Sequence, residues 1–200
     1  MNKKIGMTAS IVTLAGVTGF ALSMLVNNLF GSYLTSMVIA WGFVPLICAF
    51  AAFSADETRA AANTAIAFAA VYATFITLVY FAQLTTVRQV ILSDEAASLL
   101  DYQKFGLFFN YDLVGYSFMA LSTFFIGWTV RAENKADRWL KTLLLVHGIF
   151  AVTCVVMPIL GVFSAATPGS DKIGTLVLLF WCAYFTPVCV LSWRHFRLSA

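Results

Sequence analysis

The stretch that decides the fold covers residues 80–116, YFAQLTTVRQVILSDEAASLLDYQKFGLFFNYDLVGY. One long apolar segment ends in it with Gln83 and Arg88, and the next apolar segment begins in it with Asn110 and Asp112. An acid inside an apolar helix is costly, so it normally faces protein or water and has a partner. Asp112 is therefore the first residue to explain, and Arg88 is its candidate partner.

Around this stretch the composition is that of a membrane protein. The 200 residues are 61% hydrophobic and 10% charged, with a mean hydropathy of +0.88, whereas soluble domains are about 25% charged. A crossing needs about 20 apolar residues, so the length predicts one all-α membrane domain over residues 1–200, a polytopic bundle of six transmembrane helices. The net charge of +3 is dispersed over short loops, which argues against a nucleic-acid partner.

The apolar runs predict the position of each crossing. The six are expected at 8–27, 34–53, 57–91, 105–130, 138–163 and 172–194, with a short amphipathic helix at 94–103 after the third. The third run has no breaker and extends for about 48 Å at 1.5 Å per residue. Because a bilayer core is about 30 Å thick, this helix should tilt or project from the membrane.

The basic residues predict the orientation. With both ends in the cytoplasm, most basic side chains lie inside, as the positive-inside rule requires. The inside set is Lys3, Lys4, Arg59, Arg131, Lys135, Arg138, Lys141, Arg194 and Arg197; the outside set is Arg88, Lys104 and Lys172. The chain is thus expected to be a multi-pass protein of the cell's inner or plasma membrane.

Polar side chains on the third and fourth predicted crossings indicate a site near the outer face. The candidate ligand-binding residues are Asp112, Arg88, Tyr80, Tyr116, Thr77, Gln83 and Asn110. On the third helix, a step of 100° per residue places Thr77 and Arg88 in one stripe flanked by Tyr80, while Gln83 points elsewhere. On the fourth helix, Asp112 and Tyr116 share a face at i, i+4 spacing.

Two arrangements of these residues remain open. In the first, Arg88 reaches down to pair with Asp112 while Tyr80 and Tyr116 donate hydroxyls to the same carboxylate. In the second, Arg88 extends to lipid headgroups and Asp112 meets water outside the membrane. The first arrangement predicts a functional pocket at the outer boundary.

No cofactor, metal or catalytic residue is expected. The four cysteines fall in apolar runs without a C-x-x-C pair, and the sequence has no phosphate loop, H-E-x-x-H or nucleophile elbow. His147 lies within the fifth predicted crossing and is expected to be neutral and structural, because its charged form would be poorly solvated there. His195 lies in the tail, so no second histidine is available at membrane depth for haem.

Three functions are compatible with these features. The first is the binding or translocation of a small molecule or lipid through the polar pocket; the second is an accessory or scaffold subunit of a membrane complex; the third is an intramembrane enzyme. The size and six-helix layout are similar to those of the substrate-binding subunits of energy-coupling-factor transporters. That resemblance implies a docking face of small residues, here Ala15, Gly19 and Ser23, for a partner subunit or a second copy.

Overall fold

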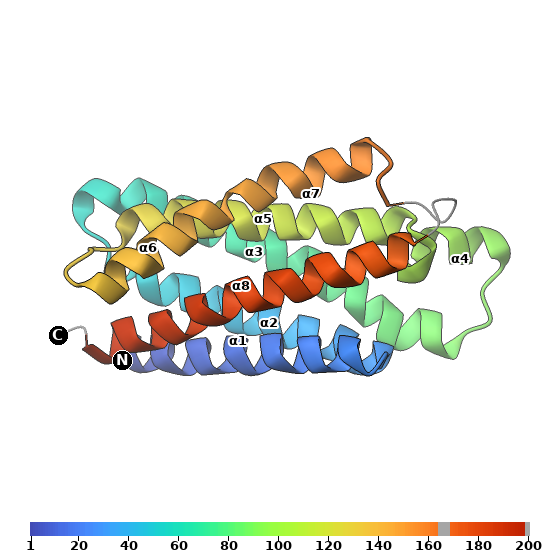
Figure 1. The fold of residues 1–200 in the computed structure, drawn as a ribbon, viewed down its shortest axis with the longest axis horizontal. Helices are drawn as coiled ribbons and strands as arrows, with labels where there is room; N and C mark the ends of the chain where they lie inside the picture. Colours follow the sequence, from blue (N-terminus) through green and yellow to red (C-terminus); the bar gives the residue numbers. More distant parts are fainter. Residues whose placement is uncertain (164–168, 199–200) are drawn as a thin grey trace.

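The computed structural model describes residues 1–163 and 169–198, and these residues are all-helical, with no strand among them. The long helices lie alongside one another in an elongated bundle (Figure 1). In chain order the elements are α1 (Asn2–Leu25), α2 (Leu29–Ala51), η1 (Asp56–Thr58), α3 (Arg59–Ala82), η2 (Gln83–Val87), α4 (Asp94–Leu100), η3 (Tyr102–Lys104), α5 (Leu107–Thr129), α6 (Lys135–His147), α7 (Ile149–Ile159) and α8 (Ser170–Leu198).

The helices α1 and α2 form a tight hairpin because small residues line their contact. A Cβ atom built at Gly19 would lie 2.8 Å from Thr35 Cγ2, and one built at Gly31 would lie 2.5 Å from Ser23 Oγ. Gly19 and Ser23 therefore pack against α2 within the chain, while Ala15 is exposed. A partner subunit at this small-residue face stays a prediction.

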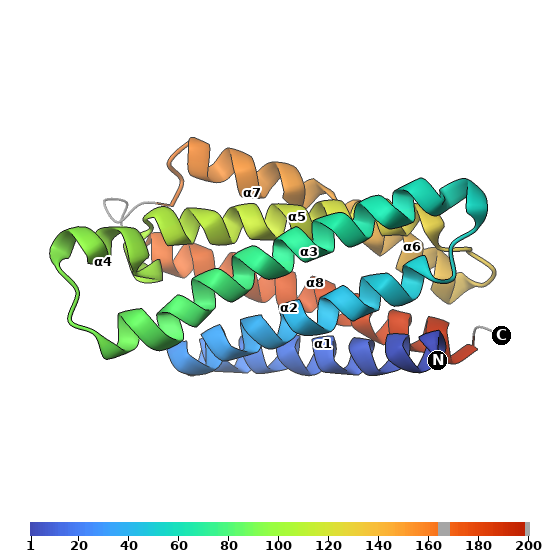
Figure 2. The same cartoon turned by 180° about the vertical axis from the view of Figure 1, so that it is seen from behind.

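The third predicted crossing is one helical run that ends in a π turn, η2. The run Asp56–Val87 has 32 residues, and α3 lies inclined to its neighbours (Figure 2). A π turn contains one more residue between hydrogen-bonded groups than an α turn, so it shifts the angular position of everything that follows. Arg88, which comes directly after η2, therefore does not continue the stripe that Thr77 begins.

The helix α5 is enclosed by α3, α6 and α7, and more than half of its residues are buried. Within the described residues, five other segments are long and apolar enough to cross a membrane: Asn2–Leu25, Leu29–Ala51, Asp56–Val87, Lys135–Ile159 and Lys172–Leu198. α5 has a similar length but carries Asn110 and Asp112. A helix enclosed by other helices presents few side chains to lipid, so it tolerates this polarity.

The fifth predicted crossing is interrupted at Gly148, which the apolar run did not indicate. Helix α6 ends at His147 and α7 begins at Ile149. A Cβ atom at Gly148 would lie 2.9 Å from Phe124 Cδ2, so glycine permits the close approach to α5. Beyond the break, α7 diverges from α8 (Figure 1), and it has no fully buried residue.

The two ends of the bundle differ in what they hold. Both chain termini lie at one end, and α4 lies at the other (Figures 1 and 2). At the terminal end, His195 Nδ1 lies 2.9 Å from Asp137 Oδ1, which ties α8 to α6. The α4 end is where the polar residues predicted from the sequence and two cavities are found.

Candidate functional site

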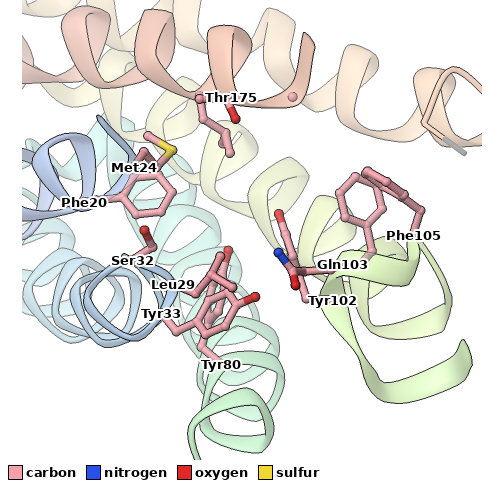
Figure 3. Close-up of a pocket in the computed structure, with 13 residues that line it drawn as sticks. Phe20, Met24, Leu29, Ser32, Tyr33, Tyr80, Tyr102, Gln103, Phe105 and Thr175 are labelled. Atoms are coloured by element: carbon pink, nitrogen blue, oxygen red, sulfur yellow. The ribbon is translucent and has the colours of Figure 1, made fainter. Parts of the chain in front are cut away.

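A cavity of about 220 Å³ opens at the α4 end of the bundle; it is called the larger cavity below. Figure 3 shows Phe20 and Met24 reaching into it from α1, with Tyr102 and Phe105 on the opposite side. Thr175 of α8 also contributes to its wall. Because apolar and aromatic side chains dominate this wall and a few polar groups converge on it, it has the composition of a small-molecule site.

Three tyrosine rings form one wall of the larger cavity. The ring centroids of Tyr33 and Tyr80 lie 5.4 Å apart, those of Tyr33 and Tyr102 5.9 Å, and those of Tyr80 and Tyr102 5.8 Å. The Tyr102 hydroxyl donates a hydrogen bond to Asp112 Oδ2 at 3.2 Å. Helices α2, α3 and α5 and the η3 turn thus meet around one carboxyl group.

A second cavity of about 70 Å³, the Asp112 cavity, adjoins the larger one. The two share the wall residues Tyr102, Phe109, Gly174 and Leu178. Asp112 is 1% exposed and lines the smaller cavity from α5. The Asp112 cavity is therefore a small, mostly apolar recess beside an aromatic pocket, with one carboxyl group in its wall.

Two of the side chains that line this recess have a buried polar atom with no hydrogen-bond partner among the described residues. These atoms are Asp112 Oδ1 and the Tyr116 hydroxyl oxygen. The Tyr72 hydroxyl also has no partner there; its ring lies 5.7 Å from that of Tyr116, but Tyr72 lines neither cavity. No salt bridge joins Asp112 to a basic side chain within the described residues. Buried polar groups are almost always paired in native proteins, so this concentration distinguishes the recess from the rest of the core.

Gln83 positions the tyrosine that holds Asp112. Its side-chain nitrogen donates to the Leu100 carbonyl at 2.8 Å, and its side-chain oxygen accepts from the Tyr102 backbone N–H at 3.0 Å. Gln83 is 3% exposed and is the first residue of the π turn. The turn thus fixes the α4–η3 connection onto α3 and sets the place of the Tyr102 ring.

His147 also lines the Asp112 cavity, but its hydrogen bonds are complete. The Trp181 indole N–H donates to His147 Nε2 at 3.0 Å, and His147 Nδ1 lies 2.7 Å from Thr123 Oγ1. Because an indole N–H can only donate, Nε2 must accept, and Nδ1 carries the proton. This is the hydrogen bonding of a neutral histidine, in agreement with the expectation from the sequence.

The predicted pair between Arg88 and Asp112 is not formed. Arg88 is exposed, and its guanidinium lies over the ring of Phe30, 4.9 Å from the ring centroid. The π turn explains the difference, because it directs Arg88 away from the face that carries Tyr80. Asp112 instead lies fully inside the protein, so neither arrangement proposed from the sequence describes it.

The remaining predicted site residues divide into two groups. Tyr80, Tyr116 and Gln83 surround Asp112 as described above. Thr77 lies elsewhere and accepts a hydrogen bond from the Trp41 indole at 3.2 Å. Asn110 is exposed on α5.

Sequence reasoning missed Tyr102, Tyr33 and Tyr72. Tyr102 lies in a connection between helices. Tyr33 lies on a helix to which no site residue was assigned, and Tyr72 lies on a different face of the third predicted crossing. One signal could have found them. Four of the seven tyrosines in the chain line the two cavities, namely Tyr33, Tyr80, Tyr102 and Tyr116, and the ring of Tyr72 lies 5.7 Å from that of Tyr116.

The site offers little for metal or nucleophilic chemistry. The described residues contain no group of three or more His, Cys, Asp or Glu side chains placed to hold a metal ion. Cys154 lines the Asp112 cavity together with His147. Both nitrogens of His147 are engaged with Thr123 and Trp181, so the imidazole has no free position with which to activate that thiol.

No protein-family model, no curated protein and no solved structure matches this chain. The similarity in layout to substrate-binding subunits of energy-coupling-factor transporters therefore carries no further argument. The class of this protein is therefore defined by its own fold and candidate site. The chain is a helical protein of membrane type with a buried carboxyl group that lies near several tyrosines and lines the smaller of two adjoining cavities.

Proposed function

We propose that this protein crosses the membrane six times, with both ends in the cytoplasm, and binds or translocates a small molecule or lipid at the Asp112 cavity. The sixth crossing is α5, whose acid Asp112 is shielded by the neighbouring helices. The nine basic residues assigned to the inside belong to segments at the terminal end of the bundle, which supports this orientation. The site then lies toward the outer face.

The observation that supports the proposal is a buried carboxyl group that lines a cavity large enough for part of a ligand. No cationic side chain of the described residues pairs with this group. Asp112 is 1% exposed, has an unpartnered oxygen and lines a cavity that adjoins another of about 220 Å³. Burying such a group without compensation costs several kcal/mol. A fold retains it where function requires it.

The same observation favours binding over the two alternative functions. A scaffold acid holds helices together through a protein partner and close packing, whereas Asp112 has an oxygen without a partner among the described residues and a cavity beside it. An enzyme needs a nucleophile or an activated base at the site. The fully bonded His147 does not supply one.

Gly174 provides a test because it lines both cavities. A Cβ atom at this position meets no described atom within 4 Å, so Gly174→Leu should fill the space without disturbing the fold. We expect native mass spectrometry of gently purified protein to detect a retained small molecule or lipid, and Gly174→Leu to lose it.

Leu176→Phe is the matched control, because Leu176 is 67% exposed and lines neither cavity. This variant should retain the bound molecule, and the thermal unfolding midpoint should be unchanged in both variants. Equal retention by wild type and by a folded Gly174→Leu protein would contradict the proposed function.

A further inference from the structure

We infer that the ligand is a protonated amine with a short apolar body, whose ammonium group binds Asp112 Oδ1 and the hydroxyl of Tyr116. This inference rests on the proposed function and names the chemical class that the same site selects. It follows from the hydrogen-bonding capacity, the charge and the shape of the Asp112 cavity.

The unpartnered atoms call for a donor that carries positive charge. A carboxylate oxygen only accepts hydrogen bonds, a phenolic oxygen accepts as well as donates, and an ammonium group offers three N–H donors and no acceptor. One ammonium group in this cavity can therefore donate to both Asp112 Oδ1 and the Tyr116 oxygen. Hydrogen bonds between ionised partners are roughly twice as strong as neutral ones.

The protein supplies no cation of its own at this place. The basic residues at this end of the bundle, Arg88, Lys104 and Lys172, are all exposed, and His147 is held in its neutral form. The acidic residues Asp94, Glu95 and Asp101 at the same end equal these three basic residues in number. It is therefore the carboxyl group of Asp112 that favours an amine over an anion.

Aromatic rings complete the environment of a cation. Trp181 also lines the Asp112 cavity, and its ring lies 5.6 Å from that of Tyr116, centroid to centroid. Ring faces attract a desolvated cation, because the face of an aromatic ring carries partial negative charge. Both the carboxyl group and the aromatic rings therefore favour a positively charged ligand.

The volumes limit the ligand. The Asp112 cavity, about 70 Å³, suits the ammonium group, and the larger cavity, about 220 Å³, takes an apolar body across the shared wall of Phe109 and Leu178. Drug-sized ligands occupy pockets of roughly 300–1,000 Å³, so the expected ligand has fewer atoms. The ammonium group can belong to a free amine or to the ethanolamine headgroup of a phospholipid.

The test compares two probes of matched size by isothermal titration calorimetry, with the protein in phosphatidylglycerol nanodiscs. The probes are 2-phenylethylamine, which is protonated at pH 7, and the uncharged 2-phenylethanol. We expect wild type to bind the amine at least about tenfold more tightly than the alcohol, as a charge-assisted contact in a buried site predicts. Asp112→Asn should remove this preference.

Two further variants separate local recognition from general effects. Tyr116→Phe keeps the ring and removes one acceptor, so it should weaken amine binding about three- to tenfold while leaving the alcohol unaffected. Asp94→Asn neutralises an exposed acid of α4 that lines neither cavity. It should change the amine affinity by less than about twofold, because exposed charges are screened.

Adding phosphatidylethanolamine to the nanodiscs identifies the natural source. If phosphatidylethanolamine competes with the probe amine, the natural ligand is the lipid headgroup. If it does not compete, the natural ligand is a free amine. Both results support an ammonium site. Equal affinity of wild type for amine and alcohol, or an undiminished amine preference in a folded Asp112→Asn protein, would overturn the inference. If either occurs while Gly174→Leu still abolishes ligand retention, the proposed function stands and only the ligand class is wrong.

Discussion

Among single residues, Asp112 is held by the fold at one oxygen only. The Tyr102 hydroxyl binds Oδ2, and Oδ1 has no partner among the described residues. The acid at the other end of the bundle, Asp137, is different, because its carboxylate pairs with His195 and accepts from the Asn134 side chain. The two buried acids thus differ in how completely the described residues satisfy their carboxyl oxygens.

This contrast predicts that changing aspartate to asparagine has a small effect on stability at Asp112 and a larger one at Asp137. Asp112→Asn should change the free energy of unfolding by less than about 0.5 kcal/mol, because no protein cation loses its partner. Asp137→Asn should cost about 1–3 kcal/mol, because it weakens a buried charged contact. Denaturant titration in detergent micelles measures both. A loss above about 3 kcal/mol for Asp112→Asn would show that the fold itself depends on this acid.

Among the elements, the π turn decides where the site is assembled. It places Gln83 against the connection that carries Tyr102, and it directs Arg88 outward. Replacing Gln83 by leucine keeps the volume but leaves the Leu100 carbonyl and the Tyr102 N–H unpaired. The position of η3, and with it the Tyr102 ring, therefore depends on one amide side chain.

Gln83→Leu should destabilise the protein by about 1–3 kcal/mol, the cost of a buried unsatisfied polar group. Amide hydrogen exchange should accelerate in residues 100–104, and the affinity for the retained ligand should fall. Gln89→Leu is the control, since Gln89 is exposed and should alter neither quantity. Unchanged exchange in residues 100–104 of the Gln83 variant would contradict the positioning role.

Two glycines allow a matched test of helix packing. Gly148 approaches Phe124 so closely that Gly148→Ala should cost about 1–3 kcal/mol through overpacking. Gly174 has open space at the same distance, so Gly174→Ala should be neutral or stabilise by up to about 1 kcal/mol. Thermal unfolding of the two variants side by side measures the difference. A larger loss of stability in Gly174→Ala than in Gly148→Ala would mean that α6 and α7 do not pack against α5 as described.

The sequence predicted the helices well because hydropathy reports them directly. The runs at 34–53 and 105–130 differ from α2 and α5 by only a few residues. The break at Gly148 escaped prediction because it arises from contact with Phe124, and no sequence pattern encodes which residue a glycine will approach. The position of a helix can be predicted from the local sequence. The interruption at Gly148 depends on a tertiary contact, so it cannot.

The site was predictable in part for the same reason. Asp112 stands out as an acid in an apolar run, and Tyr80, Tyr116 and Gln83 were found with it. Arg88 was misplaced because a uniform step of 100° per residue ignores the π turn. Tyr102 was missed because its position depends on Gln83, a contact across 19 residues that only the folded chain reveals.

For the molecule as a whole, the proposed orientation predicts which loops face outward. A cysteine at Ser98 should react with a membrane-impermeant maleimide added to intact cells. One at Glu133 should react only after the membrane is opened. Both positions are exposed, and wild type, whose cysteines lie in apolar runs, controls for background labelling. Labelling of Glu133→Cys from outside would reverse or refute the topology.

The central claim is that the cation which balances Asp112 comes from outside the chain. The most direct measurement is the density beside Asp112 Oδ1 in a high-resolution cryo-EM map of the protein purified in its native lipid. The claim predicts non-protein density within about 3 Å of this oxygen, the distance of a direct hydrogen bond. A lysine or arginine of the chain bonded to Asp112, with side chains filling both cavities, would contradict it.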